Sequence, residues 1–240
     1  MTVLVNLWSS PRNVSTAMMY AWRQRGDTVV HDEPLYAHYL RRSGRIHPGR
    51  DEVLAAQDND GAAVIEHVVL GAHDRPVAFF KHMAKHLLDL DRGFLARCHN
   101  VLLTRDPWEM LTSFQRQVPD TTIADTGLVE MVEILEAAEA AGGEPIVVEA
   151  RTLLDDPPGV LAELCRRLGL DFDPAMLSWP AGPKPEDGVW APYWYDAVHR
   201  STGWDPWQPK EVELLPALEP VLEQAGPLSE RLQTWAIAAG

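Results

Sequence analysis

Short apolar runs alternate with longer stretches of helical periodicity along most of this chain. Runs rich in β-branched and aromatic residues predict buried strands at residues 3–7, 28–31, 76–80, 99–104 and 145–149. Apolar residues recurring at helical spacing predict helices at residues 15–22, 107–114, 128–141 and 158–168. Because strand and helix alternate, we expect an α/β fold with a mainly parallel sheet covered by helices.

Other stretches depart from this alternation. Residues 35–50 are polar and contain four arginines, so we expect a partly loop-like segment and leave open whether it forms a lid. Residues 51–70 have a helical pattern. Residues 180–209 are rich in Pro, Gly, Trp and Tyr, which indicates an ordered loop packed over the sheet edge. The tail at residues 210–238 is helical in pattern, with expected breaks at Pro216, Pro220 and Pro227.

The composition is that of a globular protein, with 46% hydrophobic and 23% charged residues among 240. No linker divides the chain, so we expect one domain at residues 1–240, with residues 206–240 as a helical C-terminal extension. The sequence shows neither a secretory signal nor a long apolar span, which favours a cytoplasmic location. Cys98 and Cys165 lack metal-site spacing, and reduced thiols are favoured over a disulfide.

A net charge of −14 narrows the range of partners. It argues against nonspecific binding to nucleic acid or to an anionic membrane. An acidic protein that binds a small anion must gather its few cations at one place. Arg12, Lys81 and Arg105 therefore become informative, because each follows or ends a predicted strand.

The turn after the first strand has the features of an anion site. It combines Arg12 with several hydroxyl groups and leads into a predicted helix at Ser15. The first N–H groups of a helix have no internal partner, and the helix dipole favours negative charge there. The glycines and lysine of a Walker A loop are absent. The alternative is an ordinary strand-to-helix turn capped by Ser or Asn.

Three segments, taken in order, resemble the P-loop sulfotransferase superfamily, particularly its bacterial members. They are the turn at residues 10–16, the Asp32-Glu33-Pro34 segment, and Arg105-Asp106-Pro107 followed by Ser113 eight residues after Arg105. The resemblance covers residues 3–205. It implies a three-layer αβα, P-loop NTPase-like fold of the sulfotransferase type.

The resemblance also implies a donor, 3′-phosphoadenosine 5′-phosphosulfate, with adenosine 3′,5′-bisphosphate as product and no metal requirement. It assigns the 5′-phosphosulfate to the turn, with these positions: Ser10, Pro11, Arg12, Asn13, Val14, Ser15 and Thr16. Arg105 and Ser113 match the 3′-phosphate site, and Arg200 and Gly203 are the nearest match to the glycine-rich nucleotide clamp. Asn13-Val14 departs from the Ser-Gly common in the family.

Candidates for the chemistry lie after the second and third predicted strands. Glu33 and His82 are rival general bases toward an acceptor hydroxyl or amine, and Lys81 is the candidate that stabilises the bridging oxygen. Arg12 would stabilise the developing leaving-group charge. His86 lies four residues after His82, but no third metal ligand accompanies this pair.

An aromatic cluster in the later part of the chain has three possible roles: an apolar acceptor pocket, an adenine platform or a core beneath a loop. Its members are Trp179, Trp190, Tyr193, Trp194, Tyr195 and Trp204. The expected activity is sulfuryl transfer to a small-molecule acceptor. A P-loop-like kinase that uses ATP and Mg²⁺ and an inactive nucleotide-binding module are the alternatives. The sequence leaves the acceptor and the oligomeric state open, a homodimer included.

Overall fold

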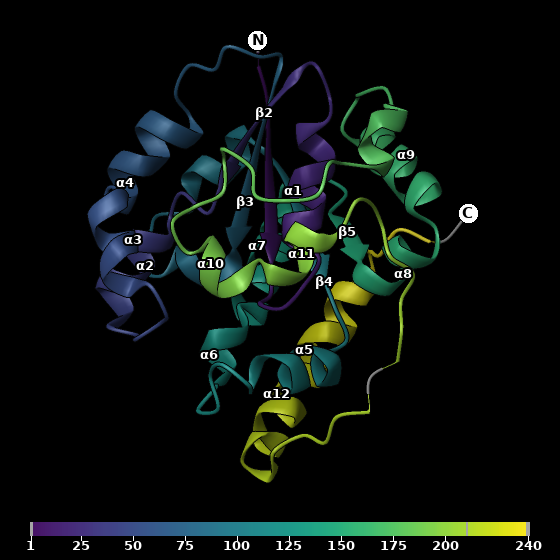
Figure 1. The fold of residues 1–240 in the computed structure, drawn as a ribbon. Helices are drawn as coiled ribbons and strands as arrows, with labels where there is room; N and C mark the ends of the chain where they lie inside the picture. Colours follow the sequence, from purple (N-terminus) through teal and green to yellow (C-terminus); the bar gives the residue numbers. More distant parts are fainter. Residues whose placement is uncertain (1, 210, 239–240) are drawn as a thin grey trace.

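A parallel sheet of five strands forms the centre of the computed structural model, which describes residues 2–209 and 211–238 (Figure 1). The strands are β1 (Val3–Ser9), β2 (Thr28–Asp32), β3 (Val77–Met83), β4 (His99–Thr104) and β5 (Ile146–Glu149). They lie in the order β2-β3-β1-β4-β5, and every neighbouring pair is parallel. The prediction of a mainly parallel α/β fold is confirmed.

The strand order places β1 at the centre of the sheet, between β3 and β4. After β1, the chain forms β2 and β3 on one side of it and then crosses to the other side, where it forms β4 and β5. In sheets of this kind, ligands bind beyond the carboxyl ends of the strands, where the strand order reverses. The turn after β1 therefore occupies the position at which this topology favours a binding site.

Helices cover both faces of the sheet. On one face, α1 (Ser15–Arg23) and α9 (Pro157–Arg167) pack in a core cluster with the alternate strand residues that include Phe79. On the other face, α5 (Pro107–Phe114), α7 (Leu128–Ala140) and α12 (Glu219–Gln233) pack in a second cluster that includes Phe80. Successive strand residues point to opposite faces, so each strand contributes to both clusters.

The remaining helices lie at the ends and edges of these layers. Figure 1 shows three of them, α2, α3 and α4, beyond β2, and α8 beside β5 on the opposite side. Their bounds are α2 (Tyr36–Ser43), α3 (Arg50–Ala56), α4 (Gly61–Val64), α6 (Ile123–Thr126), α8 (Ala150–Asp155), α10 (Ala191–Trp194) and α11 (Asp196–Arg200). A π-helical turn, η1, covers Ile65–Val69, and 3-10 turns are η2 (Ala84–Leu87), η3 (Gly93–Arg97), η4 (Pro174–Leu177) and η5 (Pro216–Leu218).

The structure refines one local expectation and corrects two others. Residues 35–50 are partly loop, as expected, but Tyr36–Ser43 form α2, because buried residues, Tyr36, Tyr39 and Leu40 among them, make an apolar stripe that packs in a third core cluster. The strand expected to end at residue 80 continues to Met83, because it pairs with β1 and β2 on its two sides. Neither Pro220 nor Pro227 breaks α12: Pro220 lies in the first turn, where its missing N–H costs nothing.

None of the helices in the described residues is both long and apolar enough to cross a membrane. Cys98 and Cys165 are free thiols, in agreement with the expectation from spacing. The proposed domain and its C-terminal extension include residues 1, 210, 239 and 240, which lie outside the described part of the chain.

Phe79→Ala tests the core on the α1 face. The Phe79 ring is fully buried and stacks on Trp22 with centroids 4.9 Å apart, so truncation removes apolar burial and leaves a cavity. We expect the free energy of unfolding, measured by urea denaturation, to fall by about 3–5 kcal/mol. The control, Ile46→Ala, alters a side chain that is 90% exposed and should change the value by less than about 0.5 kcal/mol. Equal losses in the two variants would contradict this packing.

Candidate functional site

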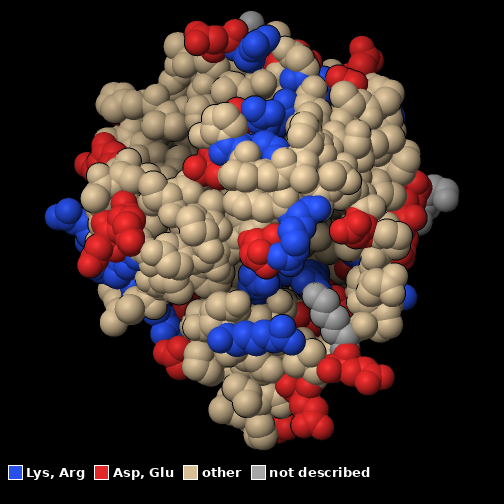
Figure 2. Space-filling model, in the orientation of Figure 1, with Lys and Arg blue, Asp and Glu red and all other residues tan. Residues whose placement is uncertain are grey.

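A cavity of about 520 Å³ lies at the carboxyl ends of the strands. Its walls come from the β1–α1 turn, the ends of β2 and β3, the start of α5, and the aromatic-rich segment that includes α10. Figure 2 shows several Lys and Arg side chains near the middle of this view, with Asp and Glu side chains both beside them and toward the rim. Five of the chain's 21 Lys and Arg residues line the cavity, namely Arg12, Lys81, Lys85, Arg105 and Arg151, and they include the three that the sequence singled out.

The β1–α1 turn achieves its tight shape without glycine. Arg12 takes a left-handed backbone conformation, with φ of 57°, which a non-glycine residue adopts at a cost in strain. The Asn13 side chain fixes the turn: its Oδ1 accepts from the Val14 N–H at 2.8 Å, and its Nδ2 donates to the Leu103 carbonyl on β4 at 2.9 Å. The Asn13-Val14 departure from the family pattern is therefore accommodated by backbone strain and a side-chain anchor.

This turn leaves helix N–H groups unpaired in the cavity wall. The first bond of α1 runs from the Met18 N–H to the Val14 carbonyl at 2.9 Å. Within the described residues, the N–H groups of Ser15, Thr16 and Ala17 have no hydrogen-bond partner. All three residues line the cavity. Donors left free at a helix N-terminus form an anion site.

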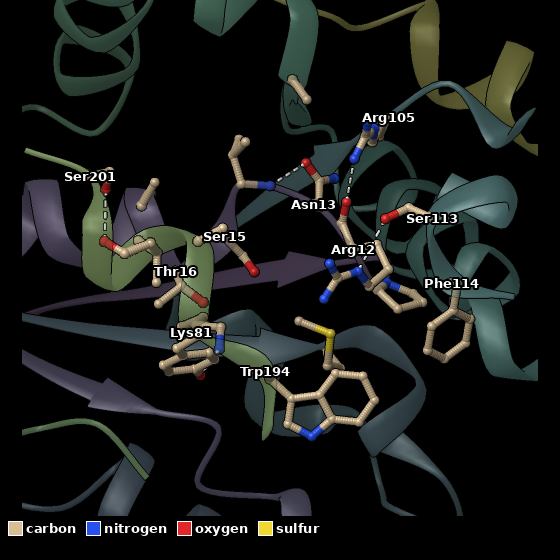
Figure 3. Close-up of a pocket in the computed structure, with 18 of the residues that line it drawn as sticks. Arg12, Asn13, Ser15, Thr16, Lys81, Arg105, Ser113, Phe114, Trp194 and Ser201 are labelled. Atoms are coloured by element: carbon tan, nitrogen blue, oxygen red, sulfur yellow. Dashed lines mark hydrogen bonds between the residues drawn. The ribbon is translucent and has the colours of Figure 1, made fainter. Parts of the chain in front are cut away.

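Three of the predicted donor contacts meet beside this turn. The Arg12 Nε donates to the Ser113 Oγ at 3.2 Å, and the Arg105 Nη1 donates to the Arg12 carbonyl at 2.5 Å. Arg12 forms no ion pair among the described residues, and its pKa is lowered first by burial and then by the charges of Arg105 and Arg116. In Figure 3 the Arg12 guanidinium and the Ser15 hydroxyl extend toward the same central space. An anion bound there would relieve the repulsion between the arginines.

The outer rim contains residues that the sequence reading missed. Arg105 donates from Nε and Nη2 to the Glu109 Oε2 at 3.0 and 2.9 Å, and the Trp207 Nε1 donates to the Glu109 Oε1 at 2.9 Å. The Arg151 guanidinium lies 4.1 Å from the Trp207 ring centroid. The spacing of four between Arg105 and Glu109 on a strand-to-helix junction could have predicted their pairing. Nothing local in the sequence signals the contact between Arg151 and Trp207.

At the inner end, Lys81 is buried in a cluster of acceptors. Its Nζ donates to the Asp32 Oδ1 at 2.9 Å, the Glu33 Oε1 at 2.6 Å and the Tyr195 hydroxyl at 2.5 Å. The Tyr195 hydroxyl donates in turn to Asp32 and accepts from the Trp190 Nε1 at 2.9 Å. Burial opposes the charge of Lys81, but the two carboxylates outweigh it and raise the pKa of the ammonium.

Glu33 is held so that one carboxylate oxygen stays available. Its backbone is also left-handed, with φ of 42°, and its Oε1 accepts from Lys81. The Oε2 has no hydrogen-bond partner among the described residues, although the His86 Nδ1 lies 3.9 Å away. Burial raises the pKa of Glu33, and the neighbouring Asp32 adds to this against the opposing charge of Lys81. A carboxylate with a raised pKa and a free oxygen in a cavity can accept a proton.

The structure separates His82 from the other candidates. Adjacent residues of β3 point to opposite faces, so Lys81 and Met83 line the cavity and His82 does not. The His82 ring stacks on Trp8 at 4.2 Å, and its Nε2 lies 3.2 Å from the Asn6 Oδ1. His86, which the sequence reading set aside, lines the cavity instead, and both its ring nitrogens lack partners among the described residues.

Of the other residues predicted to bind the donor, some line the cavity and some do not. Pro11, Asn13, Val14, Ser15, Thr16 and Gly203 line the cavity, whereas Ser10 and Arg200 do not. Ser10 is buried beneath the turn, where its Oγ accepts from the Asn13 Nδ2 at 3.5 Å. The side chain of Arg200 is 68% exposed and pairs with Asp196 on the surface of α11.

The residues of the aromatic cluster are divided between the cavity wall, the core and the surface. Trp190 and Tyr195 join a buried cluster with Tyr36 and also line the cavity. Trp194 and Trp204 line the cavity as well, whereas Trp179 packs in the α1-side core and Tyr193 is largely exposed. In the part of the chain that the structure describes, no group of three His, Cys, Asp or Glu side chains is arranged to hold a metal ion.

Comparison with known proteins agrees with this architecture. The family model described as "Sulfotransferase domain" matches residues 1–222. Branched-chain-amino-acid aminotransferase-like protein 1 of Arabidopsis thaliana is 41% identical over 201 residues, which are 83% of this chain and 36% of that protein. Branched-chain-amino-acid aminotransferase-like protein 2 of Arabidopsis thaliana is 37% identical over 227 residues, which are 94% of this chain and 40% of that protein. The chain thus spans less than half the length of these relatives.

A solved structure supports the fold. The sulfotransferase domain from the Synechococcus PCC 7002 olefin synthase superimposes with a TM-score of 0.55 at 17% identity, covering 94% of each chain. At this level of identity the likeness concerns the fold, which is that of the P-loop-like sulfotransferases. The predicted fold class and family resemblance are confirmed.

The burial of His82 predicts a dependence of stability on pH. Burial lowers the pKa of His82 from 6.5 to about 3, so between these values the unfolded chain binds a proton that the folded chain does not. Stability from this group is therefore complete above pH 6.5 and is lost as the pH falls toward 3. His82→Gln should flatten the slope of unfolding free energy against pH below 6.5 by up to about 1.4 kcal/mol per pH unit.

The matched control for this variant is His99→Gln, because His99 is exposed at the start of β4. Urea denaturation from pH 4 to 7 measures both slopes. A flattened slope in the His99 variant with an unchanged one in the His82 variant would contradict the placement of His82 in the core.

Proposed function

Because the chain belongs to the sulfotransferase domain family, we propose that it transfers a sulfuryl group from 3′-phosphoadenosine 5′-phosphosulfate to a hydroxyl or amine of a small molecule. The observation that carries this proposal is one cavity that joins an unpaired anion site to a carboxylate with a free oxygen. The anion site at Arg12 and α1 suits the donor. The inner end around Glu33 suits the acceptor.

In this proposal, the donor's 5′-phosphosulfate lies against the free N–H groups of Ser15, Thr16 and Ala17 and the Arg12 guanidinium. We assign the 3′-phosphate to Arg105 and Ser113, and their contacts with Arg12 support this assignment. Trp207 and Arg151 offer a flat surface at the rim on which adenine can stack. These contacts orient the donor and stabilise the charge that develops on the leaving phosphate.

The chemical step exchanges one sulfur–oxygen bond for another. The acceptor oxygen or nitrogen forms a bond to sulfur as the bond from sulfur to the bridging phosphate oxygen breaks, and the acceptor proton passes to the Glu33 Oε2. Positioning and charge stabilisation account for most of the catalysis in such in-line transfers. The reaction needs no metal ion in this scheme.

We assign Lys81 a positioning role. The sequence reading placed it at the bridging oxygen, but an ammonium has three N–H donors and those of Lys81 already have three acceptors at 2.5–2.9 Å. Lys81 instead fixes the Glu33 carboxylate with one oxygen turned away from the ion pair. Glu33 is preferred to His82 as the base because Glu33 lines the cavity and His82 is packed against Trp8.

Glu33→Gln tests this assignment. The amide keeps the shape of the side chain but cannot accept the acceptor proton as a carboxylate does. We expect kcat to fall by about 10²–10⁴-fold while the affinity for adenosine 3′,5′-bisphosphate changes little. Release of the bisphosphate from the donor, measured with a panel of phenols, alcohols and amines, gives the rate.

The comparison variant is His82→Gln, which alters the other proposed base within the core. Loss of turnover in the His82 variant with full turnover in the Glu33 variant would reverse the assignment. If the wild-type protein binds the bisphosphate but transfers no sulfuryl group to any acceptor, the inactive binding module becomes the better account. If the wild-type protein binds only ATP with Mg²⁺, a P-loop-like kinase becomes the better account.

A further inference from the structure

Lys85 is a second buried lysine in the cavity wall, and the proposed sulfuryl transfer does not use it. It lies in η2, directly after β3, and is only 4% exposed. Its side chain lines the same cavity as Glu33, His86 and Trp194. Buried lysines are rare unless they are paired.

Lys85 has no such pairing. Within residues 2–209 and 211–238, its ammonium forms no ion pair and no side-chain hydrogen bond with the protein. Two aromatic rings lie close to it: the Nζ is 5.1 Å from the Tyr39 centroid and 5.2 Å from the Phe114 centroid. Lys81, by contrast, has three acceptors, and Lys184 donates to the carbonyls of Pro180 and Gly182.

Two of the carboxylates near Lys85 are held by other donors. Glu33 pairs with Lys81, and the Asp125 Oδ2 accepts from Arg45 and from both the N–H and the hydroxyl of Thr122. The third, Glu130, has an Oε2 without a hydrogen-bond partner among the described residues, but it forms no ion pair with Lys85. Glu33, Asp125 and Glu130 act on Lys85 only from a distance, and burial outweighs them, lowering its pKa to about 8. The ammonium therefore still carries its charge at neutral pH.

The other titratable groups of this wall do not compensate the charge. Burial lowers the pKa of His47 to about 3 and that of His86 well below its ordinary value, so both imidazoles are neutral at pH 7. The surfaces that complete the inner end are largely aromatic, with Tyr36, Phe114 and Trp194 among them. The aromatic rings and the more distant carboxylates offset the charge of Lys85 only in part. A buried ammonium without a hydrogen-bonded anion destabilises the fold unless a ligand pairs with it.

We infer that the acceptor carries an anionic group, such as a carboxylate, that pairs with Lys85 while its hydroxyl or amine faces Glu33. This inference rests on the proposed function and narrows its substrate class to small acids with an apolar or aromatic body. The aromatic walls hold the body, and the anion fixes its direction in the cavity. Neutral alcohols and phenols of the same shape bind less tightly.

The test uses the protein saturated with adenosine 3′,5′-bisphosphate and two pairs of probes. They are 3-(4-hydroxyphenyl)propanoate with its methyl ester, and 2-hydroxy-4-methylpentanoate with its methyl ester. Calorimetric titration should show at least one acid binding at least tenfold more tightly than its ester. Equal or weaker binding of both acids to the wild-type protein would overturn the inference.

Two variants of Lys85 and one control variant separate the role of Lys85 from a general effect of charge. Lys85→Met should abolish the preference for acid over ester and raise the Tm of the ligand-free protein by about 2–4 °C, because it removes an unpaired buried charge. The matched control, Lys184→Met, should keep the preference and lower the Tm, because Lys184 has partners that would be left unpaired. Lys85→Gln repeats the affinity test with a polar side chain.

The outcomes distinguish the two proposals. An acid preference that persists in both Lys85 variants overturns the role of Lys85. Loss of the preference in both Lys85 variants, with the bisphosphate still bound, supports it. Failure of the wild-type protein to bind the bisphosphate at all would reject the proposed function and, with it, the acceptor site built on it.

Discussion

The ion cluster around Lys81 is the constraint on which the site depends. A fully buried ammonium is costly unless its charge and all three N–H groups are matched, and here Asp32, Glu33 and Tyr195 match them. Lys81 lies in β3, and Asp32 and Glu33 lie at the end of β2 and directly after it. Tyr195 belongs to the aromatic-rich segment, more than a hundred positions after Lys81. Satisfying one lysine therefore attaches that segment to the sheet edge and closes the inner end of the cavity.

Two residues in the cavity store backbone strain. Arg12 and Glu33 both adopt left-handed conformations that non-glycine residues rarely take. Strain of this kind persists where the surrounding structure fixes it, and it gathers at functional sites. Asn13 fixes the first turn against β4, and Lys81 fixes the second against β3. The strained residues are those to which we assign the donor's phosphosulfate and the acceptor's proton.

The sequence predicted the features that depend on local pattern. The strands were recognisable as apolar runs, and the turn at Arg12 was recognisable as a candidate anion site because its charge, hydroxyls and helix start are adjacent in the chain. The family pattern singled out Arg12, Arg105 and Ser113, and the structure brings these three residues into contact.

What the sequence could not supply depends on contacts distant in the chain. The end of β3 was placed too early because pairing with β1 and β2 extends the strand through polar residues. That shift places His82 on the core face and Lys81 in the cavity. The contact of Trp207 with Glu109 likewise follows from packing between segments, as does the absence, among the described residues, of an ion pair at Lys85. Binary patterns cannot reveal which charges find partners.

In our proposal, the unpaired N-terminus of α1 and Arg12 form the site of a nucleotide with 5′- and 3′-phosphates. Calorimetric titration of the wild-type protein with adenosine 3′,5′-bisphosphate, in the absence of divalent metal, is the experiment that decides whether this site exists. We expect saturable binding at a single site, from which ATP with Mg²⁺ does not displace the bisphosphate at equal concentration. Binding of ATP only when Mg²⁺ is present, with no heat from the bisphosphate, would contradict it.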